Sequence, residues 1–341
     1  RLRIAKLLKA VSTSSSAGVT NEGLFARHFL ETSVPQRPDF TQACEEAEAL
    51  VQLSDEPLIK ALGFSTKRTA GHALLLTSDE VPRAVAVLLQ SDEQFDAKST
   101  RFSVSPVAWG LNIAAKQEVP WLIVMRGSRL RLHPARPGVG VGQRGQADTW
   151  FEIDLSVIDA EQSALLPLVF SAAALAPGGS TQQILDGSAQ YAVALGERLR
   201  ARVYDEVMPR LSEALAFTLA AEQEGSMTAD RLELAYRLSL KVLFRLLFQA
   251  YAEDSRLLPY GRNEQYDRHA LKTRAKDLAA SPDQAFAAES TSIWDDLSQV
   301  WRVIDSGDKD WDVPAYNGGL FGSDSALHPE NHQLDAIRLS N

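Results

Sequence analysis

Cysteine and long apolar runs are nearly absent from this sequence of 341 residues. Its single cysteine, Cys44, cannot form an internal disulfide or the paired CxxC ligands of a zinc finger, so we expect no zinc site. A lone cysteine fits a reducing compartment, and we therefore expect a cytoplasmic protein. No apolar run approaches the length of about eighteen residues that a membrane-spanning helix requires, so we expect no membrane partner.

Basic residues are the minority among the charged ones. Lys and Arg number 35, whereas Asp and Glu number 44, which gives a formal net charge of −9. Affinity for nucleic acid comes largely from basic contacts with phosphates. The overall charge of the protein therefore does not favour binding to nucleic acid, and DNA would have to bind at a local basic patch.

One such patch lies in segment 121–147, which has five arginines and no acidic residue. Arg129 and Arg131 alternate with two leucines along a predicted strand, so both arginines project from one face of a sheet. This face either contacts phosphates, which positions DNA without reading its sequence, or is an ordinary solvated face. On the first reading the DNA-binding residues are Arg126, Arg129, Arg131, Arg136 and Arg144.

Short apolar runs bounded by turn residues predict a mixed α/β domain over residues 1–158. The runs suit buried strands, and Pro106 fits the first turn of a helix. A Gly-Ser pair between two apolar runs is typical of a hairpin turn. The predicted elements are strands at 72–77 and 84–90, a helix over 104–117, a hairpin of 121–126 and 129–134, and a strand at 149–155.

Helical patterns then predict an all-helical connector domain over residues 159–310. Thr228 is a possible N-cap for a helix over 230–252, on which only one thin stripe is polar. Such a helix is buried on most of its circumference and forms the centre of a domain. The stripe consists of Glu233, Arg237, Lys241, Arg245 and Gln249. A second amphipathic helix, 291–307, ends at Gly307. The whole chain is therefore expected to be α+β.

The order strand, strand, helix, strand within residues 72–126 resembles the core of PD-(D/E)xK nucleases. Those enzymes hold Mg²⁺ with an acid at the end of one strand and an acid-x-Lys pair on the next. Asp79 or Glu80 could supply the first acid, but Leu88 and Gln90 occupy the acid-x-Lys positions. Leucine cannot ligate a metal, so we predict a degenerate nuclease core and no catalytic residue.

A second acid-x-Lys pair bears on whether the predicted nuclease core is degenerate or active. Asp96 and Lys98 form another acid-x-Lys pair, in a polar stretch, and leave open an active Mg²⁺-dependent endonuclease that would use them with Asp79 and Glu80.

The glycine-rich run 138–145 has the spacing GxGxGxxG, but a strand follows it. Because a nucleotide-binding loop needs a helix directly after it, this run is expected to be a flexible connection.

Three segments in the second half together resemble a known family. They are "LKVLFRLLFQAYAEDSRLLP" (240–259), "IWDDLSQVWRVIDSGD" (293–308) and "YNGGLF" (316–321). Their order and spacing are similar to the helical segment that precedes the adenine-specific methyltransferase domain in type IIG and type IIL restriction–modification enzymes. Methyltransferase relatives in phage-defence systems such as DISARM share it. The opening "NEGLFARHFLET" (21–32) and the hairpin region are similar to the first part of such chains.

The resemblance implies an N-terminal portion of an adenine-specific DNA methyltransferase. The family's S-adenosylmethionine loop and N-P-P-Y motif, which hold the cofactor and the flipped adenine, are absent from these residues. We therefore expect S-adenosylmethionine to be a cofactor of the parent protein, bound by a core that follows residue 341. The implied partners are DNA and other subunits of a defence system.

Residues 311–341 are expected to lead into that core. Paired glycines permit close backbone contact, and leucine and phenylalanine favour burial. We expect the loop Tyr316, Asn317, Gly318, Gly319, Leu320 and Phe321 to dock on the methyltransferase core and to be poorly ordered without it. A non-enzymatic scaffold remains an alternative. It would dock a partner through the helix over 230–252 and through exposed tryptophans, Trp294, Trp301 and Trp311.

Overall fold

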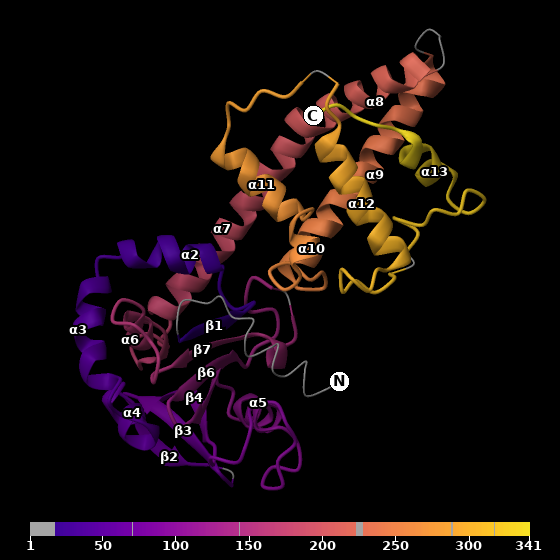
Figure 1. Ribbon diagram of the computed structural model, residues 1–341. Helices are drawn as coiled ribbons and strands as arrows, with labels where there is room; N and C mark the ends of the chain where they lie inside the picture. The colour runs from indigo at the N-terminus through magenta and orange to yellow at the C-terminus, as the bar shows by residue number, and fades with distance from the viewer. Residues whose placement is uncertain (1–17, 70, 143, 223–227, 288, 317) are drawn as a thin grey trace. The chain divides into compact units, whose positions relative to one another are not determined.

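The computed structural model describes residues 18–341 except 70, 143, 223–227, 288 and 317. In this part of the chain the fold is α+β, as predicted, and it divides into two compact units (Figure 1). The first unit ends at Glu197, and the second runs from Arg198 to Asn341.

The described strands form one seven-stranded mixed sheet in the first unit. Its order is β1-β7-β6-β5-β4-β3-β2, and only β4 and β5 pair in parallel. Parallel neighbours need a crossover, which helix α5 (Pro106–Lys116) supplies here. The strands are β1 (Val19–Glu22), β2 (Ser65–Arg68), β3 (Ala73–Ser78), β4 (Val81–Leu88), β5 (Trp121–Arg126), β6 (Arg129–Pro134) and β7 (Trp150–Asp154).

Helices cover the two faces of the sheet unequally (Figure 1). The larger core includes Leu130 and Leu132 of β6 and lies against several helices. These are α3 (Phe40–Leu50), α4 (Asp55–Ala61), α6 (Leu165–Phe170) and the start of α7 (Ser180–Arg202). On the other face, α5 packs over β4 and β5 through Val87, Leu122 and Val124. Arg129, Arg131 and His133 alternate with the leucines of β6 and therefore project from this second face.

Local sequence sets the start and the packing of α5. The Oγ of Ser105 accepts a hydrogen bond from the backbone N–H of Ala108, and Pro106 occupies the first turn. A Cβ on Gly110 would lie 2.7 Å from a methyl of Leu122, so only glycine allows the helix to lie this close to β5.

The second unit is built around α9 (Ala229–Asp254), which contacts α8 (Met208–Glu222), α11 (Leu271–Ala280) and α13 (Pro329–Ala336). A π-helical turn (Val203–Val207) precedes α8, and α10 (Glu264–Asp267) and α12 (Ser292–Ser306) complete its helices in the described residues. The first unit also holds α2 (Arg27–Thr32) and three short 3-10 turns at Val34–Gln36, Gln146–Asp148 and Gln162–Ala164. No helix in the described residues combines the length and the apolar character needed to cross a bilayer.

The division between the units lies later than the predicted boundary at residue 158. Leu166, Val169 and Ile184 are fully buried in the same core as the sheet. Segment 159–197 therefore belongs to the first unit, because its apolar side chains cover the sheet. Residues 311–341 likewise belong to the second unit, where Trp311, Phe321 and Leu334 are buried in its core.

Candidate functional site

The acids at the end of β3 lie far from the acid-x-Lys positions. Asp79 and Glu80 form the exposed turn between β3 and β4, and their φ angles of 50° and 63° are typical of a tight hairpin turn. Leu88 and Gln90 lie at the opposite end of β4. At about 3.3 Å per residue, that strand separates the two positions by roughly 20 Å.

The other acid-x-Lys pair does not join them. Asp96 and Lys98 are exposed in the loop between β4 and α5, where Asp96 is paired with Arg131. Among the described residues, no three His, Cys, Asp or Glu side chains form a group that could hold a metal ion. The four suspected residues therefore do not make one Mg²⁺ site. Sequence reasoning overlooked a metal-like spacing at His328 and His332, but this pair has no third ligand in the described chain.

Arg131 is an interior residue and not a surface contact. Its Nε lies 2.8 Å from a carboxylate oxygen of Glu152, and an Nη lies 2.9 Å from Asp96. Its guanidinium lies between two rings, 4.2 Å from the centroid of Phe95 and 3.9 Å from that of Trp150. These contacts use the charge and both faces of the guanidinium. The expectation that Arg131 contacts DNA is therefore corrected.

The other four arginines differ in what they contact. Arg129 is partly exposed and shares the buried carboxylate of Glu152. Arg126 is half-buried and donates a hydrogen bond to the carbonyl of Ser91 at 3.2 Å. Arg144 pairs at the surface with Glu22, at 3.0 Å, and Arg136 is exposed.

Arg126 and Arg129 border a concavity of about 470 Å³ in the first unit. It lies where β4 and β5 end, at the carboxyl end of the parallel pair, which is the edge where ligands bind in many α/β sheets. Its only acidic neighbour is Asp55 among the residues that line it, so the lining carries a net positive charge. The complete lining is Asp55, Leu89, Ser91, Arg126, Gly127, Ser128 and Arg129.

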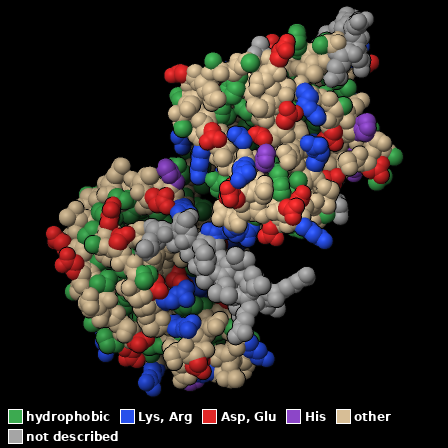
Figure 2. All heavy atoms as spheres, in the orientation of Figure 1, with side chains coloured by type: hydrophobic (Ala, Val, Ile, Leu, Met, Phe, Trp, Pro, Cys, Tyr) green, Lys and Arg blue, Asp and Glu red, His purple; other side chains and the backbone are tan. Residues whose placement is uncertain are grey.

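The concavity presents the guanidinium of Arg126 at its border. Guanidinium groups bind phosphate oxygens through paired, charge-assisted hydrogen bonds. Asp55, the first residue of α4, has a φ of 53°, a conformation that costs free energy for a residue other than glycine and that is often found at functional sites. On the face drawn in Figure 2, Lys and Arg side chains are interspersed with Asp and Glu and form no continuous basic surface.

His133 lies further along β6 and is fully buried. Burial lowers the pKa of His133 to about 4, and the nearby charge of Arg131 acts in the same direction. One ring nitrogen, Nδ1, lies 3.2 Å from the carbonyl of Gln146, whereas Nε2 has no hydrogen-bond partner. The ring is therefore neutral at pH 7 and donates its Nδ1–H to that carbonyl.

The glycine-rich run 138–145 is a connection, as the sequence predicts. The backbone N–H of Gly142 donates to the carbonyl of Gly23 at 2.9 Å, and a Cβ on Gly140 would lie 2.6 Å from the same oxygen. A 3-10 turn and then β7 follow, so no helix N-terminus faces this run. Its glycines allow close packing on Gly23.

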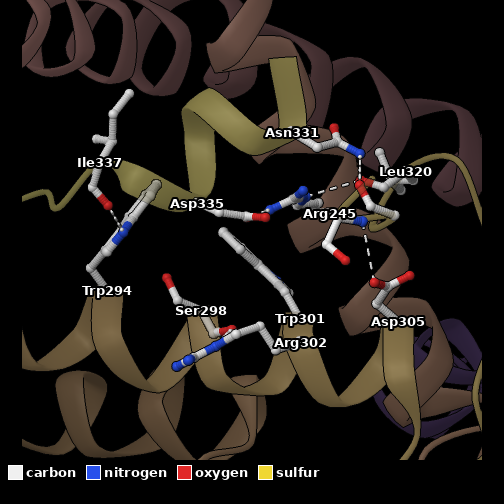
Figure 3. A network of polar contacts seen from close by, with 12 residues as sticks. Arg245, Trp294, Ser298, Trp301, Arg302, Asp305, Leu320, Asn331, Asp335 and Ile337 are labelled. Carbon is white, nitrogen blue, oxygen red and sulfur yellow. Dashed lines mark hydrogen bonds and ion pairs between the residues drawn. The ribbon is translucent and has the colours of Figure 1, made fainter. Parts of the chain in front are cut away.

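The expected docking loop is part of the second unit's own fold (Figure 3). Phe321 is 5% exposed in the core, and the backbone carbonyl of Leu320 accepts a hydrogen bond from Nε of Arg245 at 3.0 Å. Asn331 donates to the carbonyls of Gly319 and Gly322 at 3.0 and 2.8 Å. Asn317 lies outside the described residues. The expectation that this loop is poorly ordered without a further core is therefore corrected.

Buried polar residues of α9 hold this region together. Arg245 is 1% exposed and is paired with Asp335 at 3.1 Å. Burial lowers the pKa of Arg245, but the carboxylates of Asp335 and Asp305 act in the opposite direction. Gln249 accepts a hydrogen bond from the indole of Trp301 at 3.1 Å.

The tryptophans of the scaffold alternative are interior residues. Trp294, Trp301 and Trp311 are 6%, 3% and 7% exposed. The indole of Trp294 donates to the carbonyl of Ile337 at 2.8 Å (Figure 3). None of the three presents a surface for a partner. Comparison of the chain with known protein families, with curated proteins and with solved structures finds no match.

Proposed function

We propose that this chain is the DNA-positioning N-terminal portion of an adenine-specific DNA methyltransferase from a cytoplasmic restriction–modification or phage-defence system. Two observations support the proposal. The segments between residues 240 and 321 resemble the helical region that precedes the methyltransferase domain of that family. The concavity bordered by Arg126 and Arg129 offers a local basic site on a chain that is acidic overall.

The concavity carries the proposal. The guanidinium of Arg126, beside the part of Arg129 that Glu152 leaves unused, can hold one backbone phosphate. Such a contact fixes the register of DNA and carries no sequence information. The rest of the parent protein would supply S-adenosylmethionine and hold the flipped adenine. In this division of labour the chain binds duplexes weakly and without sequence preference, and it transfers no methyl group.

A binding assay with variants tests the DNA contact. The 341-residue chain is titrated with labelled duplexes of unrelated sequence, and Arg126→Gln is compared with Arg136→Gln. Arg136 is an exposed arginine outside the concavity, so its loss should change the affinity little. Loss of the Arg126 contact should weaken binding to every duplex by a similar factor of roughly ten. Equal affinities of wild type and Arg126→Gln would show that the concavity is not the contact.

Methyl transfer tests the assignment of the cofactor to the parent protein. The chain is incubated with DNA and labelled S-adenosylmethionine, and the label on DNA is counted. We expect no transfer. Methylation by these 341 residues alone would contradict the proposed division of labour, whatever the result of the binding assay.

A further inference from the structure

An apolar stripe runs along the exposed side of α9. The apolar residues of this stripe follow one another at intervals of three or four residues, except for a single interval of eight. They therefore lie on one face of the helix. Leu232, Tyr236, Phe244, Leu247 and Tyr251 are 53%, 49%, 54%, 43% and 63% exposed. Leu240, which is half-buried, fills the long interval. The opposite side of α9 is buried in the core of the second unit.

This stripe is comparable in area with the largest apolar patch on a typical monomer, which is about 300–600 Å². An aromatic side chain has about 150–250 Å² of surface, so three half-exposed ones and two leucines leave roughly 500 Å² of apolar area uncovered. The largest apolar patch of a protein is often functional. With a polar rim, the stripe approaches the area of about 800 Å² that each partner buries in a stable interface.

Arg237 and Asp254 are exposed charges of opposite sign near the two ends of the stripe, and Glu233 is a further exposed acid at the end where Arg237 lies. Arg237 and Asp254 have side chains that are 52% and 67% exposed. Arg237 has only a long surface contact, 3.6 Å from Glu330, and Asp254 has a surface pair with Lys272. Exposed pairs of this kind contribute little to stability, so both side chains can join other pairs at small cost.

We propose that α9 is a dimer interface, on which a second copy of this chain packs antiparallel. The register that places Arg237 opposite Asp254 of the second copy has its midpoint between Arg245 and Leu246. The same midpoint places Leu240 opposite Tyr251 and Phe244 opposite Leu247. One alignment thus satisfies this charge pair and covers the stripe from Leu240 to Tyr251, whereas Leu232 and Tyr236 face positions beyond the end of α9. The two-fold symmetry forms each contact twice. This self-complementarity favours a second copy over an unrelated partner, and it does not depend on the proposed function.

Sedimentation velocity on the 341-residue chain across the micromolar range tests the interface. We expect a concentration-dependent dimer. Phe244→Glu buries an unpaired carboxylate at the centre of the interface and should raise the dissociation constant roughly a hundredfold or more. Leu327→Glu replaces an exposed leucine outside α9 and should leave the dimer intact. A monomer at all concentrations, or a dimer that Phe244→Glu does not weaken, overturns the proposal.

Exchange of the two charges tests the register. Arg237→Glu alone places two acids opposite each other, and Asp254→Arg alone places two arginines opposite each other, so each should weaken the dimer. The double variant restores opposite charges and should restore the dissociation constant to within about threefold. Circular dichroism confirms that each variant is folded. A double variant weaker than both single variants contradicts the antiparallel alignment.

Discussion

Arg131 on β6 and Glu152 on β7 form a buried ion pair, with Nε and Oε2 2.8 Å apart and side chains that are 6% and 4% exposed. Glu152 also accepts from Arg129, and Arg131 lies between the rings of Phe95 and Trp150. The two strands are direct neighbours in the sheet, with Arg131 opposite Glu152 in the register. One arginine of the basic segment is therefore a structural residue. Arg129 is engaged by the same carboxylate, whereas Arg126 at the turn forms no ion pair among the described residues.

Loss of Arg131 should destabilise the first unit. Arg131→Met leaves the Glu152 carboxylate with one partly exposed partner, and removal of one member of a buried pair costs about 3–5 kcal/mol. Urea unfolding followed by circular dichroism should show this loss. The double variant Arg131→Met with Glu152→Leu should recover much of the stability, because no buried charge is left unpaired. A single variant as stable as wild type would contradict the structural role.

His133 should make the stability of the first unit depend on pH. The pKa of His133 is about 4 when folded and 6.5 when unfolded, so the unfolded chain binds the proton more readily. The contribution of the neutral ring to the free energy of unfolding is fully present above pH 6.5. It is lost as the pH falls towards 4, and the loss reaches about 3 kcal/mol. His133→Gln should flatten the unfolding free energy over this range, whereas His72→Gln, at an exposed site, should not.

Truncation of Phe321 tests whether the 316–321 loop belongs to the second unit. Phe321→Ala removes a buried ring that contacts Phe248, with centroids 5.2 Å apart, and should cost about 3–5 kcal/mol. Leu327→Ala is the matched control, because that side chain is 72% exposed, and it should change the unfolding free energy by less than about 0.5 kcal/mol. Equal stability of the two variants would mean that Phe321 does not anchor the loop.

Plasmid cleavage tests the endonuclease alternative. Because Asp79 and Asp96 are at different ends of β4, we expect no nicking with Mg²⁺ or Mn²⁺, and no effect of chelating the metal. Nicking that is lost in both Asp79→Asn and Lys98→Ala would show that these residues do converge on a metal. Such a result would contradict the placement of the β3–β4 turn.

Strongly apolar elements could be predicted from the sequence, and polar edge strands could not. Strands β3, β4 and β5 contain continuous apolar runs, and β6 alternates leucine with arginine. These strands appear close to where they were expected. Strands β1 and β2 read VTNE and STKR. Both are edge strands, which avoid apolar residues, so periodicity gives no signal for them.

The remaining wrong predictions concern side chains whose hydrogen-bond and ion-pair partners are distant in the sequence. The alternation of leucine and arginine on β6 correctly predicted two faces, but the pairing of Arg131 with Glu152 depends on the register of another strand. The helix over 230–252 was expected to be buried on most of its circumference and to carry one thin polar stripe. Arg245 and Gln249 are instead buried, because partners from other segments satisfy them, and Phe244 is exposed. Composition of a helix face alone does not reveal such partners.

The salt dependence of DNA binding tests the central claim most directly. The affinity of the 341-residue chain for one duplex is measured from about 50 to 200 mM salt, and log K is plotted against log salt concentration for wild type, Arg126→Gln and Arg136→Gln. We predict that the slope for Arg126→Gln is smaller than that of wild type by about 1, as for one lost phosphate contact, and that the slope for Arg136→Gln is unchanged. Identical slopes for wild type and Arg126→Gln would contradict a phosphate site at this concavity.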